Sequence, residues 1–206
     1  MTFLELKFAL SKFLVFSLND IRKIDSAFDR RRLVEWQEKG YIKKVIKKYY
    51  IFSDIGLNEY SLFVIANKIY SPSYISFEQA LSCYNLIPEG VFVITSATSK
   101  KTAEFFTTVA NFSYNSLKET LMFGYCVKYD RNNLPYNMAD IEKTVLDYFY
   151  IHSNLKTEDD FFEMRFNAEE FLSQFDEEKF FRYLNVFKNK ELEKRMQKFL
   201  IFLKNA

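Results

Sequence analysis

The chain has 206 residues, of which 49% are hydrophobic and 27% charged, so it can bury a sizeable core and is not mostly disordered. Four Gly and three Pro exclude collagen-like repeats and leave little material for Gly-rich phosphate-binding loops of the Walker or Rossmann type. The net charge is +2, but residues 1–54 hold twelve Lys and Arg against seven acids, a net +5, which leaves −3 for the rest. This asymmetry predicts a basic module that meets an anionic partner, nucleic acid first of all.

The first sixteen residues are apolar enough to suggest a signal peptide, but Glu5, Lys7 and Lys12 interrupt the apolar run, so an amphipathic helix is predicted. No other run reaches the ~18 to 20 apolar residues of a membrane helix, and we expect no membrane contact. Cys83 and Cys126 lie far apart without metal-ligand spacing, so neither a disulfide framework nor a zinc site is indicated. We therefore expect a cytoplasmic protein without cofactors.

The basic module has the pattern of a winged helix-turn-helix. Two capping boxes, at 17–20 and 26–29, each place a hydroxyl at the N-cap and a carboxylate three residues later. They predict two helix starts nine residues apart, with the turn at Asp25 and Ser26. Leu33 and Trp36 form the buried stripe of the second helix, and the following Lys39-Gly40 step is typical of a helix end.

Two β-prone runs, 41–46 and 49–52, then predict a hairpin, or wing. The Lys47-Lys48 pair between them lacks the Asn or Gly of a tight primed turn, so a longer or looser loop is left open. Basic side chains at the start of the second helix and on the wing would bracket a major groove and its phosphates. The predicted DNA-binding residues are Ser26, Arg30, Arg31, Arg32, Lys43, Lys44, Lys47 and Lys48.

Beyond residue 58 the pattern predicts an α+β body. Helices are expected at 60–69 and at 140–152. Another is expected to start at the capping box 76–79 and to end before Pro88. A charged helical tail follows, with helix caps at Thr157 and Asn167. Strands are expected at 91–95, 103–107, 112–114 and 123–127. The predicted fold is thus α+β, with a winged helix-turn-helix DNA-binding domain at 1–54 and a mixed α/β antitoxin domain with C-terminal helices at 58–206. We expect the second domain to fold alone.

Several ungapped segments resemble the AbiEi-type antitoxins, predicted transcriptional regulators of bacterial type IV toxin-antitoxin systems. These are IYSPSYIS at 69–76, AL at 80–81, LIPE at 86–89, ITS at 94–96, FGY at 123–125 and ADIEKTVLD at 139–147. The RLxxW and KGYI stretches of the basic module, at 32–36 and 39–42, precede them in the same order as in the family. Coverage is nearly the whole chain.

The resemblance implies a repressor that binds repeats in its own promoter and counteracts a nucleotidyltransferase-like toxin. Direct contact with that toxin stays open. Lys47-Lys48 departs from the Gly-containing wing turn of the family. Pro72 and Ser76 are interpreted as structural residues, an extended segment and a helix cap.

No catalytic site is predicted, and the chain is not expected to be an enzyme. His152 is alone and is interpreted as a packing or helix-end residue. Asp140 and Asp147 share a helix face while Glu142 points elsewhere, so Lys143 and these acids are interpreted as a solvated ladder rather than a metal site. Cys83 and Cys126 are expected to be small buried residues. The alternatives to a DNA-binding antitoxin are a nuclease targeted by the winged helix and a protein-binding antitoxin without functional DNA binding.

Overall fold

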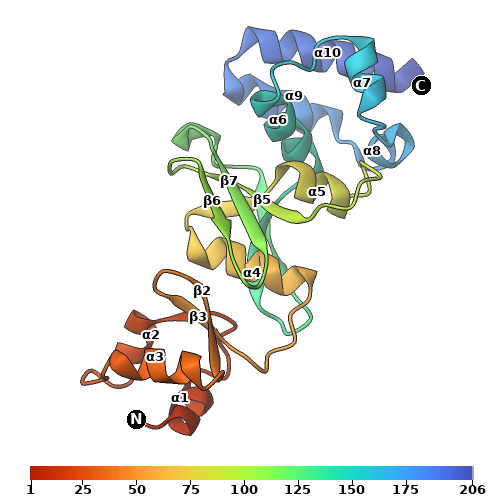
Figure 1. Ribbon diagram of the computed structural model, residues 1–206. Coiled ribbons are helices and arrows are strands. Elements are labelled where there is room, and N and C mark those ends of the chain that lie inside the picture. Colours follow the sequence, from red (N-terminus) through yellow and green to blue (C-terminus); the bar gives the residue numbers. More distant parts are fainter. Residues whose placement is uncertain (206) are drawn as a thin grey trace.

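A computed structural model describes residues 1–205 and has a mixed α+β fold. The N-terminal part contains three helices and a three-stranded antiparallel sheet of order β1-β3-β2 (Figure 1). In chain order its elements are α1 (Phe3–Ala9), β1 (Phe16–Ser17), α2 (Leu18–Arg22), α3 (Arg31–Glu38), β2 (Ile42–Ile46) and β3 (Tyr49–Phe52).

The start of α2 follows the predicted capping box. The Ser17 hydroxyl accepts from the Asp20 backbone N–H, and the Asp20 carboxylate accepts from the Ser17 backbone N–H at 2.8 Å. The second capping box is wrong, because α3 begins at Arg31 and Ser26 lies exposed in the preceding turn. Asp29 instead accepts from the Arg31 backbone N–H at 2.9 Å, and the N-cap is Arg30, so the helix start lies four residues later than predicted.

The end of α3 is confirmed at Gly40. Its φ is +70°, and the Tyr41 and Gly40 N–H groups bond to the Trp36 and Gln37 carbonyls at 2.8 and 3.0 Å. This pair of bonds is a Schellman motif, which a residue in the left-handed region closes. Trp36 is buried in a core with Phe28 and Phe52.

The hairpin of β2 and β3 turns in two residues, Lys47 and Lys48, because Ile46 pairs directly with Tyr49. The turn is therefore not longer than two residues, and Lys48 supplies its left-handed residue with a φ of +79°. The irregularity lies instead in β2, where the register shifts between Lys44 and Ile46.

The body is built on a six-stranded mixed sheet of order β6-β7-β5-β4-β9-β8 (Figure 1). The β5–β7 and β4–β9 pairs are parallel and the other pairs antiparallel. In chain order the sheet and its first helices are α4 (Glu59–Ile69), β4 (Ser73–Ile75), α5 (Phe77–Cys83), β5 (Val93–Thr98), β6 (Ala103–Phe106), β7 (Asn111–Ser116), the 3-10 helix η1 (Glu119–Leu121), β8 (Tyr125–Tyr129) and β9 (Pro135–Ala139).

Two of the interior strands of this sheet, β4 and β9, were not predicted. Each contains or follows a proline, and a short run next to proline reads as an extended connection rather than a central strand. The predicted strands exist with shifted ends; for example, β5 begins at Val93 and not at 91. The helix α5 ends at Cys83, ahead of Pro88, because Asn85 adopts a left-handed φ of +56°.

Five helices follow the sheet and form a helical tail, as predicted. They are α6 (Ile141–Ile151), α7 (Glu158–Glu163), α8 (Ala168–Gln174), α9 (Glu177–Phe187) and α10 (Lys190–Asn205). Together with α5 they bury Phe149, Phe161, Phe180 and Phe199 in one large core. This core covers one face of the sheet, from which Tyr74 of β4 and Ala139 of β9 point into it.

The helix α4 covers the opposite face and also faces the N-terminal sheet, so it lies between the two sheets (Figure 1). The core around it joins Val45 and Ile51 of the hairpin to Phe63 and Ile65 of α4. Within the N-terminal part, an ion pair joins Lys7 of α1 to Asp54, just after β3. Residues on both sides of position 54 therefore share one hydrophobic core. Among the helices of residues 1–205, none has the length and apolar character needed to cross a membrane.

Candidate nucleic-acid interface and a buried polar network

The three predicted arginines lie at the start of α3. Arg30 occupies the N-cap and is exposed. The Arg31 side chain is 92% exposed, and its Nε and Nη2 both lie 3.0 Å from Asp29 Oδ2. Arg32 donates to the Met1 carbonyl. The Arg31 backbone N–H, and then its guanidinium, hold the pKa of Asp29 below its ordinary value, so Asp29 stays charged and partly neutralises Arg31.

The outward face of α3 is mixed in charge. Beside Arg31 it exposes Val34, Glu35 and Glu38, while Leu33 and Trp36 point into the core. Lys39 bonds to Glu35 at 2.6 Å and lowers the pKa of that carboxyl. Carboxylates on this face would repel an anion, so the first turn of α3, where the arginines lie, is the part of the helix that an anionic partner could approach.

The hairpin is basic. Lys43, Lys44, Lys47 and Lys48 are all exposed, and none forms an ion pair within residues 1–205. Lysines that have no carboxylate partner can approach phosphates without first breaking an ion pair. The structure thus brings four predicted site residues together on one hairpin and three on α3, and leaves Ser26 outside both groups in the α2–α3 turn. Arg22, exposed at the end of α2, is a further cation that forms no ion pair in the described part of the chain, and the predicted site did not include it.

The body contains a fully buried ion pair between Lys143 and Asp147 of α6, each with a side chain that is 0% exposed. The solvated-ladder interpretation is therefore wrong. Tyr74 and Ser76 donate their hydroxyls to Asp147 Oδ2 at 2.8 and 2.9 Å. The Ser76 side chain serves this network and makes no side-chain cap bond at α5, which corrects its predicted role.

Burial sets the proton affinities of this network. It lowers the pKa of Lys143 and raises the pKa of Asp147, and the attraction between the two groups opposes both shifts. Burial also raises the pKa of Tyr74 well above its ordinary value, which keeps its hydroxyl protonated as a donor. Because these groups have no access to solvent, removing one member of the pair would leave the other as an uncompensated buried charge.

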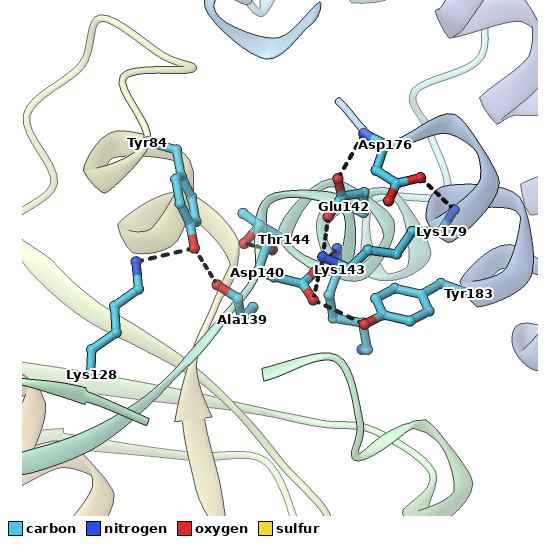
Figure 2. A network of polar contacts seen from close by, with 10 residues as sticks. All are labelled: Tyr84, Lys128, Ala139, Asp140, Glu142, Lys143, Thr144, Asp176, Lys179 and Tyr183. Atoms are coloured by element: carbon cyan, nitrogen blue, oxygen red, sulfur yellow. Dashed lines mark hydrogen bonds and ion pairs between the residues drawn. The ribbon is translucent and has the colours of Figure 1, made fainter. Parts of the chain in front are cut away.

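A second, partly exposed network lies at the start of α6 (Figure 2). Lys179 of α9 reaches Asp140 Oδ2 at 3.0 Å and Glu142 Oε2 at 2.8 Å. The prediction that Glu142 points away from Asp140 is therefore wrong, because both carboxylates bind Lys179. Burial alone would lower the pKa of Lys179, yet the bonds to Glu142 and Asp140 raise it above its ordinary value.

The remaining bonds of this network tie α6 to its neighbours (Figure 2). Tyr183 donates to Asp140 at 3.0 Å, and the Asp176 backbone N–H donates to Glu142 at 3.0 Å. On the sheet side, Tyr84 donates to the Ala139 carbonyl at 2.8 Å and accepts from Lys128. A lysine thus occupies the space between the carboxylates, and no group of three metal-ligating side chains occurs in residues 1–205.

The single histidine and the two cysteines contribute no hydrogen bond to either network within residues 1–205. His152 lies at the C-cap of α6, with Nδ1 2.9 Å from the Tyr148 carbonyl and its ring packed on Tyr148. Cys83 is partly buried, and burial raises the pKa of its thiol to about 11. Cys126 is exposed on β8, so its predicted burial is wrong.

A scan of protein-family models and a search of curated proteins found no match to this chain.

Proposed function

We propose that this protein is a DNA-binding autorepressor of the AbiEi antitoxin type, which binds promoter DNA through an N-terminal winged helix. The observation that carries the proposal is the hairpin of β2 and β3 with four exposed lysines, none of which has a carboxylate partner among the described residues. The element order α1-β1-α2-α3-β2-β3, with β1 paired to β3, is that of winged-helix domains and supports the same assignment. The resemblance of the body segments supports the antitoxin class.

In this proposal the two basic groups have different tasks. The hairpin lysines contact phosphates, which adds affinity and salt dependence but no sequence preference. Arg30 and Arg31, at the exposed start of α3, reach base edges in the major groove. Arg31 must leave Asp29 to do so, and a bidentate contact with a guanine would replace that exposed ion pair.

The test is a fluorescence titration of promoter duplex and random duplex at several salt concentrations. Lys47→Ala with Lys48→Ala should weaken binding to both duplexes and reduce the slope of log K against log salt by about 2, since each phosphate contact adds about 0.9. The control, Lys118→Ala with Lys198→Ala, removes two exposed lysines of the body that form no ion pair with any residue of 1–205, and should change neither value. Binding that is absent at low salt, or equal losses in both double variants, would refute the interface.

Arg31→Ala should instead reduce the preference for promoter DNA by about 1 to 3 kcal/mol while leaving random-duplex affinity nearly unchanged. Equal losses on both duplexes would make Arg31 a phosphate contact and remove it as a base reader.

The antitoxin part of the proposal is tested in cells with the full chain. Co-expression with the nucleotidyltransferase-like toxin that the resemblance implies should restore the growth that the toxin alone suppresses. A Lys47→Ala, Lys48→Ala variant that represses poorly yet still protects would place protection in the body. Loss of both together would mean that protection acts through transcription.

A further inference from the structure

A cleft of about 410 Å³ lies where the N-terminal part meets the body. One wall is the segment 12–15 between α1 and β1, and the others are α4 and the hairpin of β8 and β9. The lining is mostly apolar and includes Phe13, which is 43% exposed, and Val127, which is 54% exposed. A volume of this size is within the range of small-molecule sites, and its exposed apolar surface would be covered by a ligand.

The polar groups at this cleft are biased toward positive charge. Lys12 and Lys68 line it, both are exposed, and neither forms an ion pair within residues 1–205. Within residues 1–205, no Asp or Glu lines the cleft. Lys68 interacts electrostatically with Asp20 and helps to lower the pKa of that carboxyl, which accepts a hydrogen bond from the Ser17 hydroxyl. The cleft therefore suits a ligand that carries an anionic group on an apolar ring or chain.

The floor of the cleft is held in place by bonds that do not involve these lysines. Asn67 of α4 accepts from the Asn137 backbone N–H at 2.6 Å, which ties α4 to β9. The Tyr136 ring packs edge-on against Phe63 with centroids 5.4 Å apart. Because the floor is fixed, a ligand would not have to order it on binding, and a rigid ligand such as an aromatic ring would lose little conformational freedom of its own.

We propose that this cleft binds a small aromatic carboxylate, with the ring system between Phe13 and Val127 and the carboxylate between Lys12 and Lys68. We further infer that its occupancy changes DNA affinity, a step that rests on the proposed function. The cleft segment 12–15 continues directly into β1, and Ser17 of β1 pairs with Tyr49, the residue that follows the Lys47-Lys48 turn. A ligand that displaces this segment thus acts on the strand pair that carries the basic hairpin.

The experiment uses the full chain and two probes of the same shape and opposite charge, 2-naphthoate and 2-naphthylmethylamine, in isothermal titration calorimetry. Naphthoate should bind at one site and at least tenfold more tightly than the amine. Lys12→Gln with Lys68→Gln should weaken naphthoate by about tenfold, as expected for two solvent-exposed charge contacts. The matched control, Lys118→Gln with Lys198→Gln, removes the same charge elsewhere and should not weaken it.

An independent variant tests the apolar wall. Val127→Asp places a carboxylate at a side chain that is already 54% exposed, so the fold should tolerate it, and naphthoate binding should be lost. Equal affinity for the two probes, or equal effects of the two lysine pairs, would overturn the site. Circular dichroism of each variant separates loss of binding from loss of fold.

The regulatory step is measured separately, as DNA affinity with and without saturating naphthoate. A change of at least threefold in the unmodified protein, absent in the Val127→Asp variant, supports it. Unchanged DNA affinity with confirmed ligand binding overturns the regulatory step alone. Absence of any DNA binding defeats the proposed function but leaves the ligand site to be judged by calorimetry.

Discussion

Gly124 is the position at which a single added methyl group should do most damage. A Cβ built there would lie 2.9 Å from Tyr183 Cε2 and 3.0 Å from both Cβ and Cγ of Lys143. Its φ of +69° is also one that residues with a side chain rarely adopt. Neither neighbour can move freely, because Lys143 is fully buried and Tyr183 donates to Asp140.

Gly40 separates the two contributions to this cost. Its φ of +70° is nearly the same, but a Cβ there would meet nothing within 4 Å. Gly40→Ala should therefore show the backbone cost alone, about 1 to 2 kcal/mol of unfolding free energy. Gly124→Ala adds overpacking of about 1 to 3 kcal/mol, for a total of about 2 to 5 kcal/mol.

The assay is urea unfolding at neutral pH, followed by far-UV circular dichroism and by the fluorescence of Trp36, the only tryptophan. Trp36 lies in the N-terminal core, so it reports that part directly, while circular dichroism reports the whole chain. Midpoint shifts at constant m-value give the free-energy differences. Equal losses for the two alanine variants, or no loss in Gly124→Ala, would show that α6 and α9 do not close over Gly124 as described.

Three further predictions concern the body. Lys143→Met leaves Asp147 buried without its partner and should cost about 3 to 5 kcal/mol in urea unfolding, whereas Lys143→Met with Asp147→Asn should recover at least about 1 kcal/mol of that; an unimproved double variant would argue against a buried charge. Phe199→Ala removes a fully buried ring of the large core and should cost about 3 to 5 kcal/mol, and a loss below about 1 kcal/mol would contradict that packing. Backbone N–H groups at the start of α7 hold the pKa of the Asp160 carboxyl below its ordinary 3.8. The charged carboxylate therefore stabilises the fold above pH 3.8, and this stabilisation is lost as the pH falls through the lowered pKa of the folded state. In acid unfolding, the difference in stability between the protein and Asp160→Asn should disappear over that range, and a difference that persists would exclude a contribution from this titration.

Local chemistry determined much of this structure from the sequence alone. The capping boxes that start α2 and α7 and the glycine that ends α3 were recognisable because their bonds join residues at most five positions apart. The charge of the hairpin was recognisable for a similar reason, since four lysines in a short exposed run need no tertiary contact to be basic. The amphipathic stripe of α3 likewise followed from the spacing of Leu33 and Trp36.

Only the tertiary structure decided what covers each helix and each strand. Lys143 and Asp147 have the spacing of an ordinary exposed pair, and their burial depends on Tyr74 from β4 and on α9, which lie far away in the sequence. Ser76 has the spacing of a helix cap, but Asp147, 71 positions away, takes its hydroxyl. The cleft at Lys12 and Lys68 has the same origin, because it exists only where segments from three parts of the chain meet. Burial and cavities arise from contacts between segments that are distant in the sequence, so they cannot be predicted from the spacing of residues within one segment.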